Sequence, residues 1–252
     1  MSERFFFVHV LKTGGTDLFT RLGGDPAITV DHPYTFRPAE IYPNDTDGDV
    51  FKVAPQMDVE QLEKRWAARS DEIRIIMGHF PLCTVERLEA DFTTLSVVRE
   101  PVERTLSFLR HHRKLTPEDR DKSFEEIYVD DFRFKSLIEN HMVKMFSLTN
   151  DEMTDGMLTR IDFDRERLER AKAGLATVDI LGLQEHFEAF CAELTDRFGW
   201  DLGTPLWANR TLPADIPQSL IEQIAADNAL DVELYEHAVE LCADRAVRVL
   251  EA

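Results

Sequence analysis

Short apolar runs alternate along the chain with stretches in which apolar residues recur every three or four positions. The runs at residues 5–10, 73–77, 94–98 and 178–181 predict buried strands. The periodic stretches predict helices at residues 16–22, 59–68, 102–114, 124–128, 134–146, 165–176, 184–198, 217–226 and 230–250. Strands that alternate with helices favour an α/β fold with a central parallel sheet flanked by helices.

Residues 25–55 lack sustained periodicity and carry much of the proline, several aspartates and the aromatic residues Tyr34, Phe36 and Tyr42. We expect irregular structure there, as in a lid or a substrate loop. The sequence has no internal repeat, low-complexity tract or long linker. It therefore predicts a single domain over residues 1–252, with C-terminal helices within residues 215–252.

The charge balance restricts the ligands. The 252 residues include 29 Lys and Arg against 48 Asp and Glu, a formal net charge of −19, while 43% hydrophobic residues suffice for a full core. Sequence-independent binding to nucleic acid or to an anionic membrane needs a net basic face, so both are disfavoured. An anionic ligand has to find a locally positive site.

The cysteines and the N-terminal apolar run indicate the compartment. Cys83, Cys191 and Cys242 are odd in number and widely spaced, which predicts neither a disulfide framework nor a zinc site. The run at residues 5–11 is too short to span a membrane, and no small-residue cleavage site follows it. We expect a cytoplasmic protein without a membrane span.

Residues 9–18, His-Val-Leu-Lys-Thr-Gly-Gly-Thr-Asp-Leu, lie where a predicted strand meets a helix N-terminus. Such a position favours anions, because free backbone N–H groups and the helix dipole point outward. Two glycines let the backbone curl round an anion, Lys12 can neutralise it, and the hydroxyls of Thr13 and Thr16 can donate to it. The order differs from a Walker A loop, in which Lys follows the glycines. A plain Gly-Gly turn with a solvated lysine is the alternative.

A second segment, residues 95–107, follows another predicted strand. It places Arg99 at the strand end and Ser107 two helical turns later, where the pair could clamp a second phosphate.

Together the two segments resemble the sulfotransferase superfamily, in which a loop of the form HxPKTGGT and a motif of the form LRDPVERxxS bind 3′-phosphoadenosine 5′-phosphosulfate (PAPS). Residues 181–187, 198–200 and 228–235 resemble C-terminal landmarks of the same superfamily, so the likeness covers nearly the whole chain. It is closest to the branch of heparan sulfate and other carbohydrate sulfotransferases. The resemblance implies a P-loop-like sulfotransferase fold.

The resemblance also implies residue roles. Lys12 would contact the bridging oxygen and the sulfuryl group, the loop would hold the 5′-phosphate, and Arg99 with Ser107 would grip the 3′-phosphate. Leu11 and Asp17 stand where the family has proline and serine, which puts the contribution of Asp17 in doubt. The implied nucleotide contacts are Lys12, Thr13, Gly14, Gly15, Thr16, Asp17, Arg99, Ser107 and, in a late loop, Arg210.

Transfer to an alcohol needs a base near the acceptor hydroxyl. His79 follows a predicted strand and is our candidate, with His32 in reserve; a hydrogen-bonded structural histidine is the alternative for His79. His9, within a predicted strand, is interpreted as structural, beneath the loop.

Two further groups of polar residues have more than one interpretation. The basic run at residues 110–114 is typical of a solvated helix end, but it continues the helix that carries Ser107 and could attract the nucleotide or an anionic acceptor. Asn140 and Lys144 share a helical face and could line the acceptor site, although a surface pair is favoured.

The leading hypothesis is a PAPS-dependent sulfotransferase that moves a sulfuryl group to a hydroxyl, less favourably an amine, of a carbohydrate or small metabolite. Adenosine 3′,5′-bisphosphate (PAP) would be the second product, and no metal would be needed. The expected partner is a glycan or small-molecule acceptor rather than nucleic acid, and a neutral acceptor suits the net charge better than a densely sulfated polymer. The sequence leaves the oligomeric state open. A small-molecule kinase of the P-loop type and a catalytically idle nucleotide-binding scaffold are the alternatives.

Overall fold

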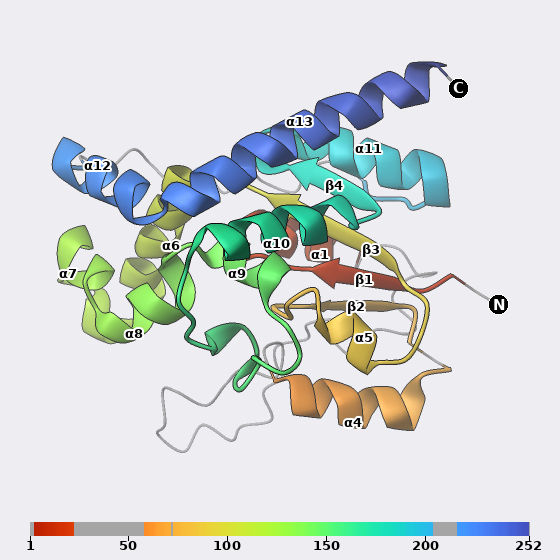
Figure 1. The fold of residues 1–252 in the computed structure, drawn as a ribbon, viewed down its shortest axis with the longest axis horizontal. Coiled ribbons are helices and arrows are strands. Elements are labelled where there is room, and N and C mark those ends of the chain that lie inside the picture. The colour runs from red at the N-terminus through yellow and green to blue at the C-terminus, as the bar shows by residue number, and fades with distance from the viewer. Residues whose placement is uncertain (1–2, 23–57, 72, 204–215, 252) are drawn as a thin grey trace.

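The computed structural model describes residues 3–22, 58–71, 73–203 and 216–251. Its centre is a four-stranded sheet in the order β2-β1-β3-β4, in which every neighbouring pair is parallel. The strands are β1 (Phe5–Val8), β2 (Ile75–Gly78), β3 (Thr93–Val98) and β4 (Ile180–Leu183). Helices flank this sheet (Figure 1), so the predicted α/β fold with a central parallel sheet is confirmed.

The strand order creates a reversal between β1 and β3. Phe5 of β1 is in register with Ile75 on one side and with Thr93 on the other. The chain leaves β1 for β2, whereas it leaves β3 for β4 on the opposite side of the sheet. In open parallel sheets, ligands bind at the carboxyl ends of the two strands where this reversal occurs.

The alternating side chains of β1 bury both faces of the sheet. Phe5 and Phe7 pack with residues of α1 (Gly15–Leu22) and α11 (Phe187–Phe198). Phe6 lies in the larger apolar cluster on the other face. Figure 1 shows α9 and α10 in front of the sheet, with α1 and α11 behind it.

The remaining helices surround this core and the carboxyl ends of the strands. They are α4 (Val59–Arg69), α5 (Thr84–Arg87), α6 (Pro101–Leu115), α7 (Phe124–Tyr128), α8 (Asp131–Arg133), α9 (His141–Ser147), α10 (Arg165–Ala176), α12 (Gln218–Asp227) and α13 (Ala229–Glu251). Short 3₁₀ turns occur at Pro117–Asp119, Gly156–Leu158 and Gln184–His186. Figure 1 shows the strand arrowheads pointing toward the side on which α6, α7 and α8 lie.

The helix predicted over residues 134–146 is wrong as a single element. A π-helical turn at Phe134–Ile138 precedes α9, and between them Asn140 takes a left-handed backbone with φ 39°. The break allows hydrogen bonds that cap the starts of both α13 and α9. The Asn140 side-chain oxygen accepts hydrogen bonds from the N–H groups of Leu230 and Asp231, both at 3.1 Å, at the start of α13. The Asp231 carboxylate in turn caps the start of α9, so tertiary capping overrides the local helical period.

The strand predicted at residues 178–181 lies two residues later, at Ile180–Leu183. The Val178 N–H donates to the carbonyl of Leu175, in the last turn of α10, at 3.2 Å, so residue 178 still belongs to the helix end and not to the strand. Residues 184–186, predicted as the start of a long helix, form a 3₁₀ turn before α11, which ends as predicted at Gly199 with φ 69°. Residues 25–55, the expected lid, lie outside the described part of the chain. Over the described ranges, no helix is both long enough and apolar enough to cross a membrane.

Candidate anion-binding site

The loop between β1 and α1 turns sharply at the carboxyl edge of the sheet. Lys12 has φ 67° and Gly14 has φ 98°, both in the left-handed region. The Gly14 carbonyl accepts hydrogen bonds from the N–H groups of Asp17 (2.9 Å) and Leu18 (3.2 Å), which closes the first turn of α1. A lysine in this backbone region is uncommon, and strain of this kind clusters at ligand-binding segments.

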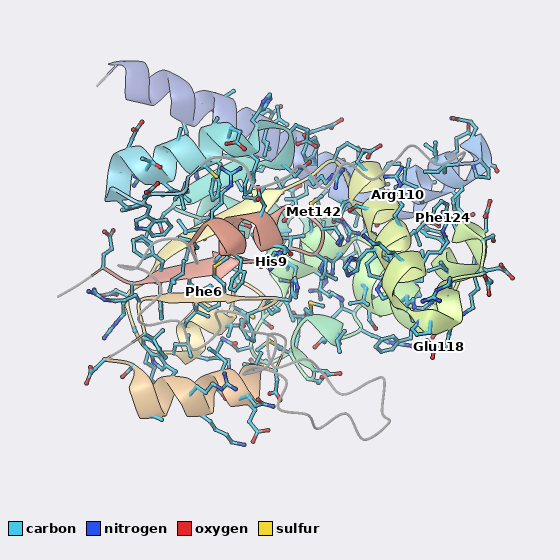
Figure 2. The ribbon with its side chains drawn as sticks, turned by 180° about the vertical axis from the view of Figure 1, so that it is seen from behind. Phe6, His9, Arg110, Glu118, Phe124 and Met142 are labelled. Atoms are coloured by element: carbon cyan, nitrogen blue, oxygen red, sulfur yellow. The ribbon has the colours of Figure 1, made fainter. Side chains whose placement is uncertain are left out.

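His9 supports the loop from beneath. A Cβ atom added at Gly15 would lie 2.1 Å from Nε2 of His9, so the imidazole fills the space where a side chain of residue 15 would begin. Figure 2 shows His9 at the end of β1, beside α1. The second glycine of the loop is therefore required by packing, and His9 has the position expected of a structural residue under the loop.

The polar side chains of the loop, Thr13, Thr16 and Asp17, differ in their exposure and in their hydrogen-bond partners. The Thr13 hydroxyl donates to the Val10 carbonyl at 2.9 Å, and the residue is fully buried. Its expected hydroxyl contact with an anion is therefore wrong, and only the Thr13 backbone can contribute. Thr16 is exposed on α1. Asp17, whose role the resemblance left in doubt, directs its carboxylate to Arg21 at 3.2 Å, away from the start of the helix.

Arg99, at the end of β3, brings the second motif to this loop. Its Nη1 atom donates to the Lys12 carbonyl at 3.4 Å, although the residues are 87 positions apart. Burial lowers the pKa of Arg99, and burial together with the charge of Arg99 lowers the pKa of Lys12. Two cations therefore lie side by side at the reversal between β1 and β3, an arrangement that an anion would relieve.

The carboxylates around Arg99 are mostly engaged elsewhere. Glu100 caps α6 by accepting from the N–H groups of Val102 (3.0 Å) and Glu103 (2.8 Å). Glu185 accepts from Glu100 N–H and from the Tyr235 hydroxyl. Glu103 is the direct partner of Arg99, at 3.4 Å, and its side chain is 52% exposed. An ion pair this long and exposed is weak, so an incoming phosphate can replace it.

Ser107 lies one helical turn beyond Glu103 on α6, and residues four apart share a helix face. The Arg99 guanidinium that reaches Glu103 is thus directed along the face that carries Ser107. Within the described residues, the Ser107 hydroxyl makes no hydrogen bond and Arg99 Nε is buried without a partner. Both groups are free to contact a ligand. Arg210, the late-loop candidate, lies outside the described residues.

His79 follows β2 and lies next to His9, with ring centroids 4.1 Å apart. Its Nδ1 is 2.7 Å from the His9 carbonyl, which can only accept, so Nδ1 carries the proton and Nε2 keeps its lone pair. Burial first and then the charge of Lys12 lower the pKa of His79 to about 4, against the effect of the hydrogen bond. His79 is therefore neutral at neutral pH and close to Lys12. His32, the reserve candidate, lies outside the described residues.

The basic run on α6 does not form a uniformly solvated helix end. His111 is exposed, and the charge of Lys12 contributes to lowering the pKa of its imidazole, while Arg110 contributes to the lowered pKa of Arg99. Both residues therefore lie within electrostatic reach of the loop. Arg113, in contrast, packs over the ring of Phe124 at 3.8 Å.

Asn140 and Lys144 neither form a surface pair nor line an acceptor site. Both are buried, and Lys144 is fully so. The Lys144 ammonium donates to the carbonyls of Ser136 (2.6 Å) and Thr159 (3.3 Å), and Asn140 caps α13. Both earlier interpretations are wrong, because the break after the π-helical turn directs this segment inward.

The arrangement suits a ligand with more than one anionic group. The loop of Lys12, the Arg99 guanidinium and the neutral imidazole of His79 follow β1, β3 and β2, the three neighbouring strands of one sheet edge. In the part of the chain that is described, no three His, Cys, Asp or Glu side chains are placed to hold a metal ion.

Comparisons with known proteins find similarity in structure but none in sequence. No protein-family model matches the chain, and no curated protein matches it in sequence. Among solved structures, it is similar to a sulfotransferase from Alicyclobacillus acidocaldarius, with 16% identity and a TM-score of 0.43 over 95% of this chain and 97% of that one. A likeness at this level does not identify the chain.

Proposed function

We propose that the protein is a PAPS-dependent sulfotransferase that transfers a sulfuryl group to a hydroxyl of a carbohydrate or small metabolite, with an amine as the less favoured acceptor. The contact between Arg99 and the Lys12 carbonyl carries the proposal. It joins the two segments that resemble the phosphosulfate and 3′-phosphate motifs at the ligand-binding edge of a parallel sheet.

The residues fit the donor at both of its anionic ends. The backbone from Thr13 to Asp17 and the start of α1 would hold the 5′-phosphosulfate. Arg99, after releasing Glu103, and the Ser107 hydroxyl would hold the 3′-phosphate. The bound donor supplies an activated sulfuryl group.

The chemistry assigns separate roles to Lys12 and His79. The acceptor oxygen forms a bond to sulfur as the bond from sulfur to the bridging phosphate oxygen breaks, and PAP leaves. Lys12 stabilises the charge that develops on that oxygen. The hydroxyl proton passes to Nε2 of His79, whose Nδ1 is fixed by the His9 carbonyl. The negative donor offsets the charge of Lys12, one of the causes that lower the pKa of His79, and so makes His79 a better base.

The proposed setting is a reducing cytoplasm. The described chain contains three cysteines, all of them free thiols, with Cys83 and Cys191 buried.

Donor choice tests the proposal against the kinase alternative. The protein is incubated with ³⁵S-labelled PAPS without magnesium, and separately with γ-³²P-labelled ATP plus magnesium, each with a mixture of sugars and alcohols. Loss of ³⁵S from PAPS without magnesium, reduced at least a hundredfold in His79→Gln, is the expected result. Transfer from ATP, or an unchanged rate in His79→Gln, would contradict the proposed donor or the proposed base.

A further inference from the structure

Arg110 and His111 extend the positive site along α6. They lie three and four residues after Ser107, and seven and eight after Glu103. Helical residues at these spacings share one face, which is the face that Arg99 reaches through Glu103. Figure 2 labels Arg110 on α6. The two side chains therefore continue the row that begins at the 3′-phosphate position.

Arg110 lacks the partner that an arginine in an acidic chain ordinarily finds. Its Nε atom is buried without a hydrogen bond, and its side chain forms no ion pair with any residue that the structure describes. Glu103, the carboxylate on the same helix face, pairs with Arg99, and once the donor releases it, it still lies two helical turns from Arg110. The side chain is only partly buried, so its guanidinium remains accessible and can form charge-assisted hydrogen bonds with an anion.

The electrostatic neighbours of the pair lie in the proposed active site. The charge of Arg110 contributes to the lowered pKa of Arg99, and the charge of Lys12 contributes to the lowered pKa of His111. The two phosphates of the donor already account for the Lys12 loop and for Arg99 with Ser107. Arg110 and His111 thus remain as positive and hydrogen-bonding groups beyond the nucleotide.

We infer that Arg110 and His111 form a third anion position that binds a carboxylate, sulfate or phosphate group of the acceptor. This inference rests on the proposed function. It predicts an anionic acceptor, whereas the net charge of the protein alone favoured a neutral acceptor. A protein of net charge −19 repels a polyanion, so the acceptor carries one such group rather than many.

The test measures binding of ³⁵S-labelled inorganic sulfate to protein saturated with PAP, by equilibrium dialysis. Arg110→Met removes the charge and retains most of the side-chain length. The control is Arg120→Met, because Arg120 is exposed and its side chain has no partner in the described structure. We expect sulfate affinity to fall about tenfold in Arg110→Met and to stay unchanged in Arg120→Met, with PAP affinity within twofold of wild type in both. Glucuronate should displace the sulfate, and glucose should not.

Three results would overturn the inference. Equal sulfate affinity in wild type and Arg110→Met would mean that the sulfate is adventitious. A tenfold loss of PAP affinity in Arg110→Met would assign Arg110 to the nucleotide instead. Displacement of sulfate by glucose as well as by glucuronate would remove the selection for an anionic acceptor. Failure of the wild type to bind PAP is a separate outcome, which would overturn the proposed function itself.

Discussion

Two clusters of cations lie at the two ends of the Arg99–Arg104 segment, and their surroundings differ. At the sheet edge, Arg99 donates a hydrogen bond to the Lys12 carbonyl. The ion-pair partner of Arg99 is Glu103, which is exposed and 3.4 Å away. In the interior, Arg104 and Lys144 are both fully buried. The same residue types thus occur once in a site that lacks a strong anionic partner and once in a site closed to solvent.

The cations of the interior cluster find their partners inside the protein, although Nε of Arg104 is buried without a hydrogen bond. Arg104 donates to the carbonyls of Leu137 (3.3 Å) and Ile138 (2.8 Å), and Lys144 donates to those of Ser136 and Thr159. The buried Asp231 carboxylate attracts both cations. Short contacts to carbonyls and a buried carboxylate make this cluster structural, whereas the long, exposed contacts of Arg99 at the sheet edge leave it available to a ligand. The strength and exposure of the partners, rather than the residue types, distinguish the two clusters.

Lys12→Ala should have the largest effect, because it removes the charge that stabilises the leaving oxygen. We expect sulfuryl transfer to slow by about 10²–10³-fold, with a smaller change in PAP affinity. Single-turnover loss of ³⁵S from PAPS measures the rate. Lys12→Arg, which keeps the charge, is the control, and transfer at the wild-type rate in Lys12→Ala would remove Lys12 from the chemistry.

Arg104→Met tests the structural half of the comparison. It leaves the carbonyls of Leu137 and Ile138 without donors and Asp231 with one cation fewer, so the free energy of unfolding should fall by about 3 kcal/mol. Urea unfolding followed by circular dichroism measures the loss. Unchanged stability would show that the interior cluster is not structural.

Arg99→Met is the matched test of the binding half. Since Arg99 has a weak internal partner, stability should change by less than about 0.5 kcal/mol. PAP affinity should fall about 10–100-fold, as expected when a charge-assisted hydrogen bond is removed. Titration calorimetry and urea unfolding on the same preparation separate the two effects. A large stability loss with intact PAP binding would reverse the comparison.

Gly15→Ala places a methyl group against the His9 ring. We expect a loss of about 1–3 kcal/mol in stability from overpacking, together with weaker PAP binding as the loop shifts. Thermal unfolding and calorimetry measure these. Gly203→Ala is a control for a glycine substitution in open space, since no atom lies within 4 Å of the added Cβ, although its φ of 60° adds backbone strain there. Wild-type PAP affinity in Gly15→Ala would show that the loop tolerates a shifted His9.

The pH dependence of stability reports the environment of His79. Its pKa is 6.5 when unperturbed and about 4 in the folded protein, so between these values the unfolded chain binds the proton more readily. Stability is therefore full above pH 6.5 and is lost as pH falls toward 4. In His79→Gln the slope should decrease by up to about 1.4 kcal/mol per pH unit near pH 5. Urea unfolding from pH 4 to 7 measures this, and an unchanged slope would show that His79 titrates normally.

Local patterns predicted the architecture well. The apolar runs and helical periods located the strands to within two residues, and α7 and α10 agree at both ends. The break at Asn140 could not be foreseen, because its cause is a pair of capping contacts with α13, about 90 residues away. The same long-range contacts determine the burial of Lys144.

The candidate site was predictable in its positions and less so in its contacts. In the sequence, Lys12, His79 and Arg99 each follow a predicted strand. Because parallel strands end at one edge of the sheet, the three residues were expected to lie near each other. The Thr13 hydroxyl was misassigned because its bond to the Val10 carbonyl belongs to the folded turn. The inference about Arg110 needed the folded structure, because a basic helix end is ordinarily solvated and the sequence does not show which acidic side chains are already paired.

Titration calorimetry of the purified protein with PAP and, separately, with ADP, both without added metal, tests the central claim most directly. A site built from the Lys12 loop and an Arg99–Ser107 clamp requires the 3′-phosphate. Micromolar binding of PAP with much weaker binding of ADP is the predicted result. Preference for ADP, or binding of neither nucleotide, would contradict the clamp and with it the assignment of a sulfuryl donor.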